Sequence, residues 1–182
     1  MDEVVRAARV TKGALYHHFR DKDDLFRAVV EQVKQDVTTA VGASFLDDTA
    51  TENPGERVYS MCLALIDAHL DPAVQRISVV DVRAVFDAET RRELDNRYEV
   101  SLLRGAFRSA MRTGAFERQP LGPLANIVAA ALFEACALIS EADDCVAARA
   151  EASHVVARLL RGLEAPTPTQ PETDTNTARA QS

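Results

Sequence analysis

The sequence predicts an all-α fold. Apolar residues recur every three or four positions along almost the whole chain, which is the spacing of one face of an α-helix. Proline, glycine and capping residues separate these stretches and mark where helices begin and end. The longest pattern predicts one helix from Asp21, its N-cap, to about Phe45. Its apolar residues repeat every four positions, with Phe26 and Val30 beside them: Leu25, Val29, Val33, Val37 and Val41.

Length and composition indicate a globular protein. The chain has 182 residues, of which 47% are hydrophobic and 27% charged, so it can bury a core of one or two domains. It has no uncharged apolar run of about 18 residues, which argues against a membrane span, and its N-terminus lacks the pattern of a signal peptide. Three widely spaced cysteines, Cys62, Cys136 and Cys145, predict reduced thiols in the cytoplasm.

Residues 11–19 predict a short helix with two different faces. Thr11 is a suitable N-cap. Leu15 and Phe19 lie one turn apart on an apolar face, with Val10 just ahead of them. The other face carries a cation, a glycine and two side chains able to reach phosphate: Lys12, Gly13, Tyr16 and His17. This pattern fits the second helix of a helix-turn-helix, and it also fits an ordinary amphipathic helix.

The run Lys12-Gly13-x-Leu15-Tyr16-x-x-Phe19-x-x-Lys22 resembles the DNA-binding segment of TetR-type transcriptional regulators, and the resemblance extends over residues 4–29. Arg9 stands at the turn position where the family often has glycine. The family also has a helix ahead of this segment that the present sequence does not contain. The resemblance implies a helix-turn-helix head and connecting helix over 1–45, a helical ligand-binding and dimerisation body over 46–164, and a tail over 165–182. We expect the tail to be disordered.

The resemblance implies a sequence-specific regulator, expected to be a repressor that binds a double-stranded DNA operator as a homodimer and is released by a small-molecule inducer. The alternative is a dimeric small-molecule-binding protein with weak or no DNA binding, because the first helix is absent. The net charge is −7, but residues 1–20 carry +2, which leaves −9 on the remainder. The expected DNA-binding residues are Thr11, Lys12, Gly13, Ala14, Tyr16, His17 and Lys22.

The body is predicted to contain several further helices. One begins at Pro54 and runs through Leu70, and Asp71-Pro72 starts another that is expected to be kinked or broken near Asp81. A long helix capped by Asp87 is expected to continue through Met111 and to stop before Gly114.

The last two predicted helices, Leu121–Ile139 and Asp144–Leu163, are strongly apolar. The first is apolar on nearly every face, so we expect it to be buried all round. By resemblance, residues 120–163 form a homodimer interface of two helices from each subunit. A wholly intramolecular core is the alternative.

Bulky or polar residues on the inward faces of the body are candidates for an inducer pocket, although such a stripe is more often plain core. These candidates are Met61, Cys62, Leu65, His69, Phe86, Tyr98, Leu102, Phe107 and Phe133. A redox role for the cysteines is a minor alternative. Adjacent His17 and His18 cannot both face one metal from a helix, and motifs of hydrolases and nucleotide-binding enzymes are absent. We therefore expect no metal, no cofactor and no enzymatic activity.

Overall fold

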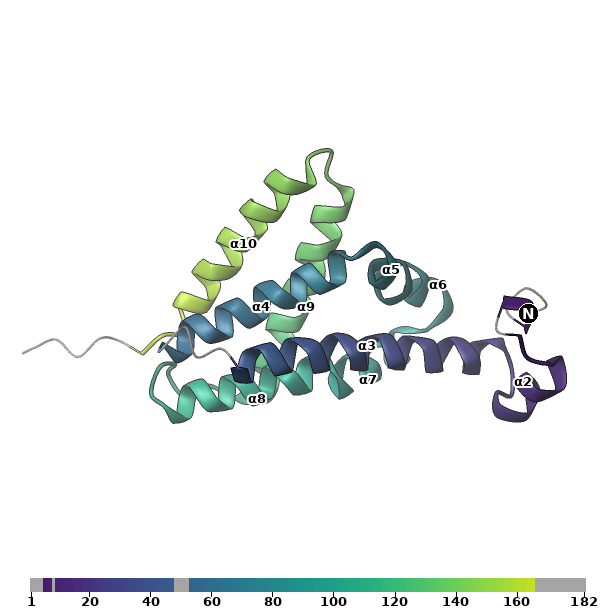
Figure 1. The fold of residues 1–182 in the computed structure, drawn as a ribbon. Helices are drawn as coiled ribbons and strands as arrows, with labels where there is room; N and C mark the ends of the chain where they lie inside the picture. Colours follow the sequence, from purple (N-terminus) through teal and green to yellow (C-terminus); the bar gives the residue numbers. More distant parts are fainter. Residues whose placement is uncertain (1–4, 8, 48–52, 166–182) are drawn as a thin grey trace, which may run out of the picture.

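The computed structural model describes residues 5–7, 9–47 and 53–165 (Figure 1). Its named elements are helices joined by short connections, and a single bridge pairs Phe116 with Glu164. The all-α prediction is therefore confirmed. Val4, Ala8, residues 48–52 and the expected disordered tail from 166 onward lie outside the described residues.

The head consists of a short helix at the end of a long one. Helix α2, Lys12–His18, lies at one end of α3, Lys22–Asp47, and the other helices gather along the rest of α3 (Figure 1). Two caps set these boundaries. The Ala14 N–H donates to Thr11 Oγ1 at 3.1 Å, and the Asp24 N–H donates to Asp21 Oδ1 at 2.8 Å. Both predicted N-caps are confirmed.

The buried face of α3 differs in part from the predicted one. Val37 and Val41 are buried as expected, but Val29 is exposed and its neighbour Val30 is fully buried. The buried face also contains the charged Lys34. The shift arises because α3 packs against two clusters, the main core and a smaller cluster of Val30, Val82 and Leu94.

The middle of the chain follows the predicted starts and stops with one exception. Helix α4, Pro54–Leu70, is followed by α5, Pro72–Gln75, the π-helix η1, Arg76–Asp81, and α6, Val82–Val85. Near Asp81, where a kink or break was predicted, the chain stays helical and changes from π- to α-helical winding. The single helix predicted from Asp87 to Met111 is wrong. It consists of α7, Ala88–Arg97, and α8, Glu99–Arg112, with a break at Tyr98.

The break at Tyr98 has a packing consequence. Its backbone angles, φ −106° and ψ −86°, are not helical. Leu94 before the break lies in the smaller cluster, whereas Leu103 and Phe107 after it lie in the main core. One uninterrupted helix would have to serve both clusters with one face, and the break removes that constraint. Gly114, with φ +78°, ends the segment as predicted.

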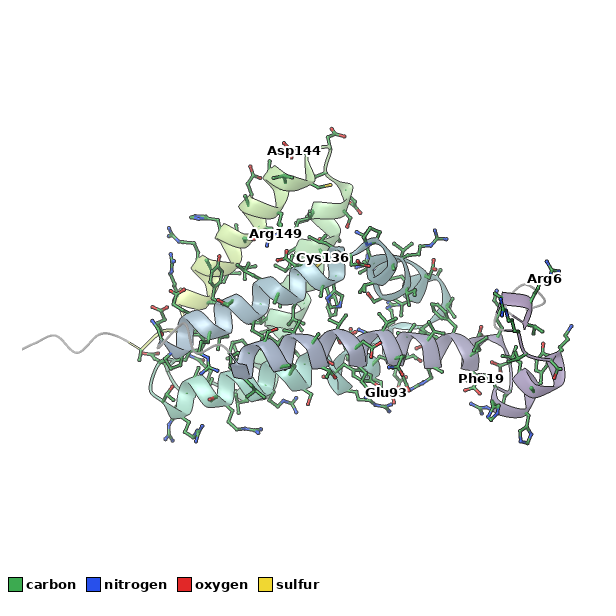
Figure 2. The ribbon with its side chains drawn as sticks, viewed as in Figure 1. Arg6, Phe19, Glu93, Cys136, Asp144 and Arg149 are labelled. Carbon is green, nitrogen blue, oxygen red and sulfur yellow. The ribbon has the colours of Figure 1, made fainter. Side chains whose placement is uncertain are left out.

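The last two helices, α9, Leu121–Glu141, and α10, Cys145–Arg161, form a hairpin with Asp144 at its tip (Figures 1 and 2). By length and mean hydropathy (1.8) α9 could span a membrane, but it packs against α4, α8 and α10 as a core helix does. The prediction that α9 is buried all round is wrong for the single chain. Ala125, Ala129 and Leu132 are buried, but Ile127 is 68% exposed because no described element covers that face.

Candidate nucleic-acid interface and buried polar site

Helix α2 has the predicted inward and outward faces. Leu15 is 8% exposed and Phe19, at the junction with α3 (Figure 2), is half-buried. On the opposite side Tyr16 is 46% exposed and His17 is exposed. Val10 was expected inward, but it is 41% exposed. The chain changes direction at Arg9, whose φ is +53°, so Val10 does not continue the face that carries Leu15.

The outward face of α2 offers hydrogen-bonding groups and a close approach to backbone. Its sequence contains no acidic residue. A Cβ built at Gly13 would have Thr11 Oγ1, at 4.0 Å, as its nearest neighbour, so the described chain itself does not require glycine there. All the expected DNA-binding residues are exposed: Thr11, Lys12, Gly13, Ala14, Tyr16, His17 and Lys22.

The predicted pocket residues do not share one cavity. Leu65, His69 and Phe133 line a small cavity between α4, α8 and α9. Tyr98 and Leu102 line a separate groove between α3 and α8. The other four are packing residues in the two clusters: Met61, Cys62 and Phe107 in the main core, and Phe86 against Phe26.

A buried ionic cluster, which the sequence reasoning missed, lies beside the small cavity. Lys34 Nζ donates to Glu99 Oε1 at 2.9 Å and to Asp95 Oδ1 at 2.9 Å. Burial opposes the charged form of each group. The charge of Lys34 and the neighbouring imidazole of His69 nevertheless hold the pKa of Glu99 below its ordinary value, and the two carboxylates raise the pKa of Lys34. Both groups are therefore charged at neutral pH.

His69 joins this cluster to the cavity wall. Its Nδ1 lies 2.8 Å from the Leu65 carbonyl oxygen, so Nδ1 carries a proton and donates. Its Nε2 lies 3.4 Å from Glu99 Oε1. The edge of the ring contacts the face of Phe133, with 5.2 Å between ring centroids, and Lys34 Nζ lies 5.1 Å from the same aromatic ring.

A signal for this cluster was present in the sequence. Lys34 lies between Val30 and Val37 at helical spacing, so it shares the buried face of a long helix. A lysine there needs an acidic partner. The sequence pattern could not identify that partner, since Glu99 is 65 residues away in the chain.

Phe133 lines two spaces in the body. One is the small cavity, about 10 Å³, which is the size of one water molecule. The other is a larger cavity of about 270 Å³. The small cavity is lined by Leu65, His69, Glu99, Leu103, Ala129, Leu132, Phe133 and Cys136, and the larger one by Ser78, Val79, Val82, Arg83, Arg91, Asp95 and Phe133.

The cysteines differ in their surroundings. Burial raises the pKa of Cys62 and of Cys136 to about 12, so these thiols are protonated and unreactive at neutral pH. Cys145, at the start of α10, is exposed. No group of three or more His, Cys, Asp and Glu side chains within the described residues is arranged to hold a metal ion.

Two family comparisons bear on this architecture. Residues 55–163 match the family described as "Tetracyclin repressor-like, C-terminal domain", and residues 1–29 match "Bacterial regulatory proteins, tetR family". The chain belongs to the TetR family of transcriptional regulators. It therefore combines part of the TetR helix-turn-helix region with the TetR helical C-terminal domain, and its family is non-enzymatic and regulates transcription through DNA binding.

Three individual proteins show how far the similarity extends. A crystal structure of a TetR-family transcriptional regulator from Pectobacterium atrosepticum is 32% identical, with a TM-score of 0.75 over 91% of this chain and 83% of that one. Reduced NemR from E. coli shares the fold, with 16% identity and a TM-score of 0.62 over 93% of this chain and 88% of that one. The transcriptional regulator AcuR of Cereibacter sphaeroides is 40% identical over 47 residues, which are 26% of this chain and only 22% of AcuR.

Proposed function

We propose that this regulator is a repressor that binds a near-palindromic operator as a homodimer and is released by a small-molecule effector. The observation that carries the proposal is the two-faced α2 helix, with Leu15 packed inward and Tyr16 and His17 turned to solvent. Two copies of α2 would enter successive major grooves, whose centres lie about 34–36 Å apart.

The exposed residues of the head divide into two expected roles. Tyr16, His17 and Lys22 are suited to contact phosphate oxygens and to set the position of the helix. Thr11, Lys12 and Ala14 are suited to contact base edges from the N-terminal end of α2. Gly13 allows the backbone of the first turn to approach the DNA closely.

Apolar side chains on α9 and α10 support the homodimer. Ile127 is 68% and Leu159 is 59% exposed, and Leu138 and Val155 are also exposed. An apolar groove of about 170 Å³ lies between the two helices. Burying such side chains is worth roughly 1.5–3 kcal/mol each. A second copy of α9 and α10 would cover this face in a bundle of two helices from each subunit.

Release requires an effector that prefers one conformation of the dimer. Both cavities are lined by Phe133, whose ring centroid lies 5.1 Å from Lys34 Nζ of α3, the helix that carries the head. A ligand bound there would favour the body conformation that it fits best, and α3 would pass the change to the spacing of the two α2 helices.

Fluorescence anisotropy with labelled promoter DNA tests the proposal. The full chain should bind a twofold-symmetric duplex from the neighbouring promoter more tightly than a scrambled duplex, and its affinity should fall as salt rises. Tyr16→Ala and Lys22→Ala should weaken binding, whereas Arg112→Ala, at the end of α8, should not. If the wild-type chain shows no salt-dependent preference for any such duplex, the repressor proposal is wrong and the effector-binding dimer without DNA affinity is favoured.

A further inference from the structure

The small cavity between α4, α8 and α9 is lined by Glu99, one of whose carboxylate oxygens is buried without a donor. Glu99 Oε2 is fully buried, and within the described residues no donor lies within hydrogen-bond distance of it. The other oxygen, Oε1, accepts from Lys34 at 2.9 Å. An ionised oxygen left without a partner in an apolar site is costly. The remaining walls of this cavity are mostly Leu, Ala and Phe side chains.

The neighbouring groups define what a ligand must offer here. His69 Nδ1 donates to the Leu65 carbonyl, so in the neutral ring Nε2 is an acceptor. In the charged ring, Nε2 points its proton toward Glu99 Oε1, 3.4 Å away. In either state Glu99 Oε2 remains an acceptor, and the missing partner is a hydrogen-bond donor.

The charges of the cluster favour a cation. Lys34 contacts two carboxylates, Asp95 and Glu99. With a neutral His69 this cluster carries a net charge of −1, and with a charged His69 it is neutral. A ligand carboxylate beside Glu99 Oε2 would repel Glu99 in either state, whereas an ammonium group would donate to the free oxygen and, with a neutral His69, would balance the charge of the cluster.

The room for the rest of the ligand is offered by a second space that Phe133 also lines. The small cavity alone holds about 10 Å³, and the second space holds about 270 Å³. Val79 and Val82 give part of that space apolar walls, and its charged side chains are Arg83, Arg91 and Asp95. A movement of the Phe133 side chain that connects the two spaces would let a polar group at Glu99 and an apolar body beside Val79 and Val82 belong to one small molecule.

We propose that the effector is a compact apolar amine, whose ammonium group donates to Glu99 Oε2 and whose body occupies the two spaces lined by Phe133 once that side chain moves to connect them. The assignment deepens the proposed function, because release of DNA by this ligand rests on it. A ligand bound to Glu99 acts directly on the carboxylate that holds Lys34, and Lys34 belongs to the helix that carries the DNA-binding head.

Three probes that share a phenyl ring differ in their polar group, and they therefore test which polar group the site binds: benzylamine, benzyl alcohol and benzoate. We expect benzylamine to raise the Tm of the full chain by about 2–4 °C at a concentration of about five times its Kd. Benzyl alcohol should bind more weakly, because a neutral donor lacks the charge, and benzoate should give no shift. A benzoate shift equal to or larger than that of benzylamine would overturn the proposal.

Two variants test whether benzylamine binds at Glu99. Glu99→Gln should weaken benzylamine by about 10-fold or more, since it removes a charge-assisted hydrogen bond. Glu93→Gln, on the exposed side of α7, is the matched control and should keep the wild-type affinity. A Glu99→Gln variant that folds and binds benzylamine as tightly as wild type contradicts the assignment.

A wild-type measurement covers the case in which Glu99→Gln fails to fold. The ring nitrogen signals of His69 in ¹⁵N NMR, assigned with His69→Gln, should move as benzylamine is added, while those of exposed His154 should not. An unmoved His69 signal under saturating amine would rule the site out. These readouts need no DNA, so failure of operator binding would overturn the proposed function and leave the amine site standing.

Discussion

Lys34 of α3 and Glu99 of α8 form a buried ion pair, with 2.9 Å between Nζ and Oε1, and both side chains are almost inaccessible to solvent. The pair connects the helix that carries the DNA-binding head to the core of the C-terminal domain. Asp95 provides the second carboxylate from α7. A buried pair of this kind is costly to break, because removing one partner leaves an uncompensated charge.

Removing either partner should therefore destabilise the protein strongly. We expect Lys34→Met and Glu99→Gln each to lower the free energy of unfolding by about 3–5 kcal/mol, and the double variant to lose much less than the sum. Urea denaturation of the four proteins measures this coupling. Arg27→Met is the control, because its partners Glu31 and Glu93 are partly exposed, and it should cost less than about 1 kcal/mol. Additive losses for the two core substitutions would contradict the buried pair.

The ion pair of Lys34 and Glu99 also predicts that the free energy of unfolding depends on pH. The folded pKa of Glu99 lies below its ordinary value of 4.5, so its contribution is present above pH 4.5 and is lost as the pH falls through the folded pKa. The free energy of unfolding of the wild type should therefore fall more steeply below pH 4.5 than that of Glu99→Gln. The variant should keep a shallower slope, since hydrogen bonds from the Arg20 backbone and side chain lower the pKa of Asp24, and the capping hydrogen bond from the Thr90 N–H lowers the pKa of Asp87. Equal slopes in acid would count against this contribution of Glu99.

The three cysteine thiols should differ in their reactivity toward a thiol reagent. In the native protein, a thiol reagent at pH 7 should modify Cys145 and leave Cys62 and Cys136 unmodified, because burial keeps the latter two protonated. All three should react after unfolding in guanidinium chloride. Rapid native modification of Cys62 or Cys136, seen by mass spectrometry, would contradict their burial.

Local signals in the sequence predicted most of the fold because helix caps and apolar spacing are local. Thr11, Asp21 and Asp87 each cap the helix that was expected to follow. The break at Tyr98 could not be predicted in this way, because it depends on two separate clusters that helices distant in sequence build together.

The two candidate sites differ in the same way, because one depends on local spacing and the other on contacts between distant residues. The outward face of α2 follows from the spacing within seven residues, and the sequence placed Tyr16 and His17 correctly on it. The buried cluster depends on contacts between Lys34 and residues more than 60 positions away. Sequence spacing therefore selected His69 as a pocket residue but missed Glu99, which it faces at 3.4 Å.

The proposed dimer predicts a change in oligomeric state. Leu159→Glu, on the exposed face of α10, should convert the dimer to a monomer, because it places a charge where a second copy would be packed. Sedimentation velocity measures the mass. Arg158→Glu, at the neighbouring exposed position, changes the charge by more, yet we expect it to keep the dimer, because the interface is assigned to the apolar positions. A wild-type chain that sediments as a monomer at micromolar concentration would contradict the interface.

A substitution of Gly13 should affect stability and DNA binding differently. A glycine in a helix costs about 1 kcal/mol relative to alanine, and an alanine Cβ at this position would meet only Thr11 Oγ1 at 4.0 Å. Gly13→Ala should therefore leave stability unchanged or raise it by up to about 1 kcal/mol, while the added methyl group weakens operator binding by blocking the close approach of the backbone to DNA.

Arg9→Gly is the matched comparison in the same head. Arg9 has a φ of +53°, which glycine adopts without the cost that other residues incur, so this change should also stabilise, by roughly 0.5–1 kcal/mol. Because Arg9 lies in the turn ahead of α2, we expect its replacement to weaken operator binding less than Gly13→Ala does. Thermal denaturation and operator anisotropy on both variants give the two readouts. A Gly13→Ala variant with unchanged stability and unchanged operator affinity would show that the first turn of α2 does not approach the duplex closely, and the assignment of Thr11, Lys12 and Ala14 to base contacts would have to be abandoned.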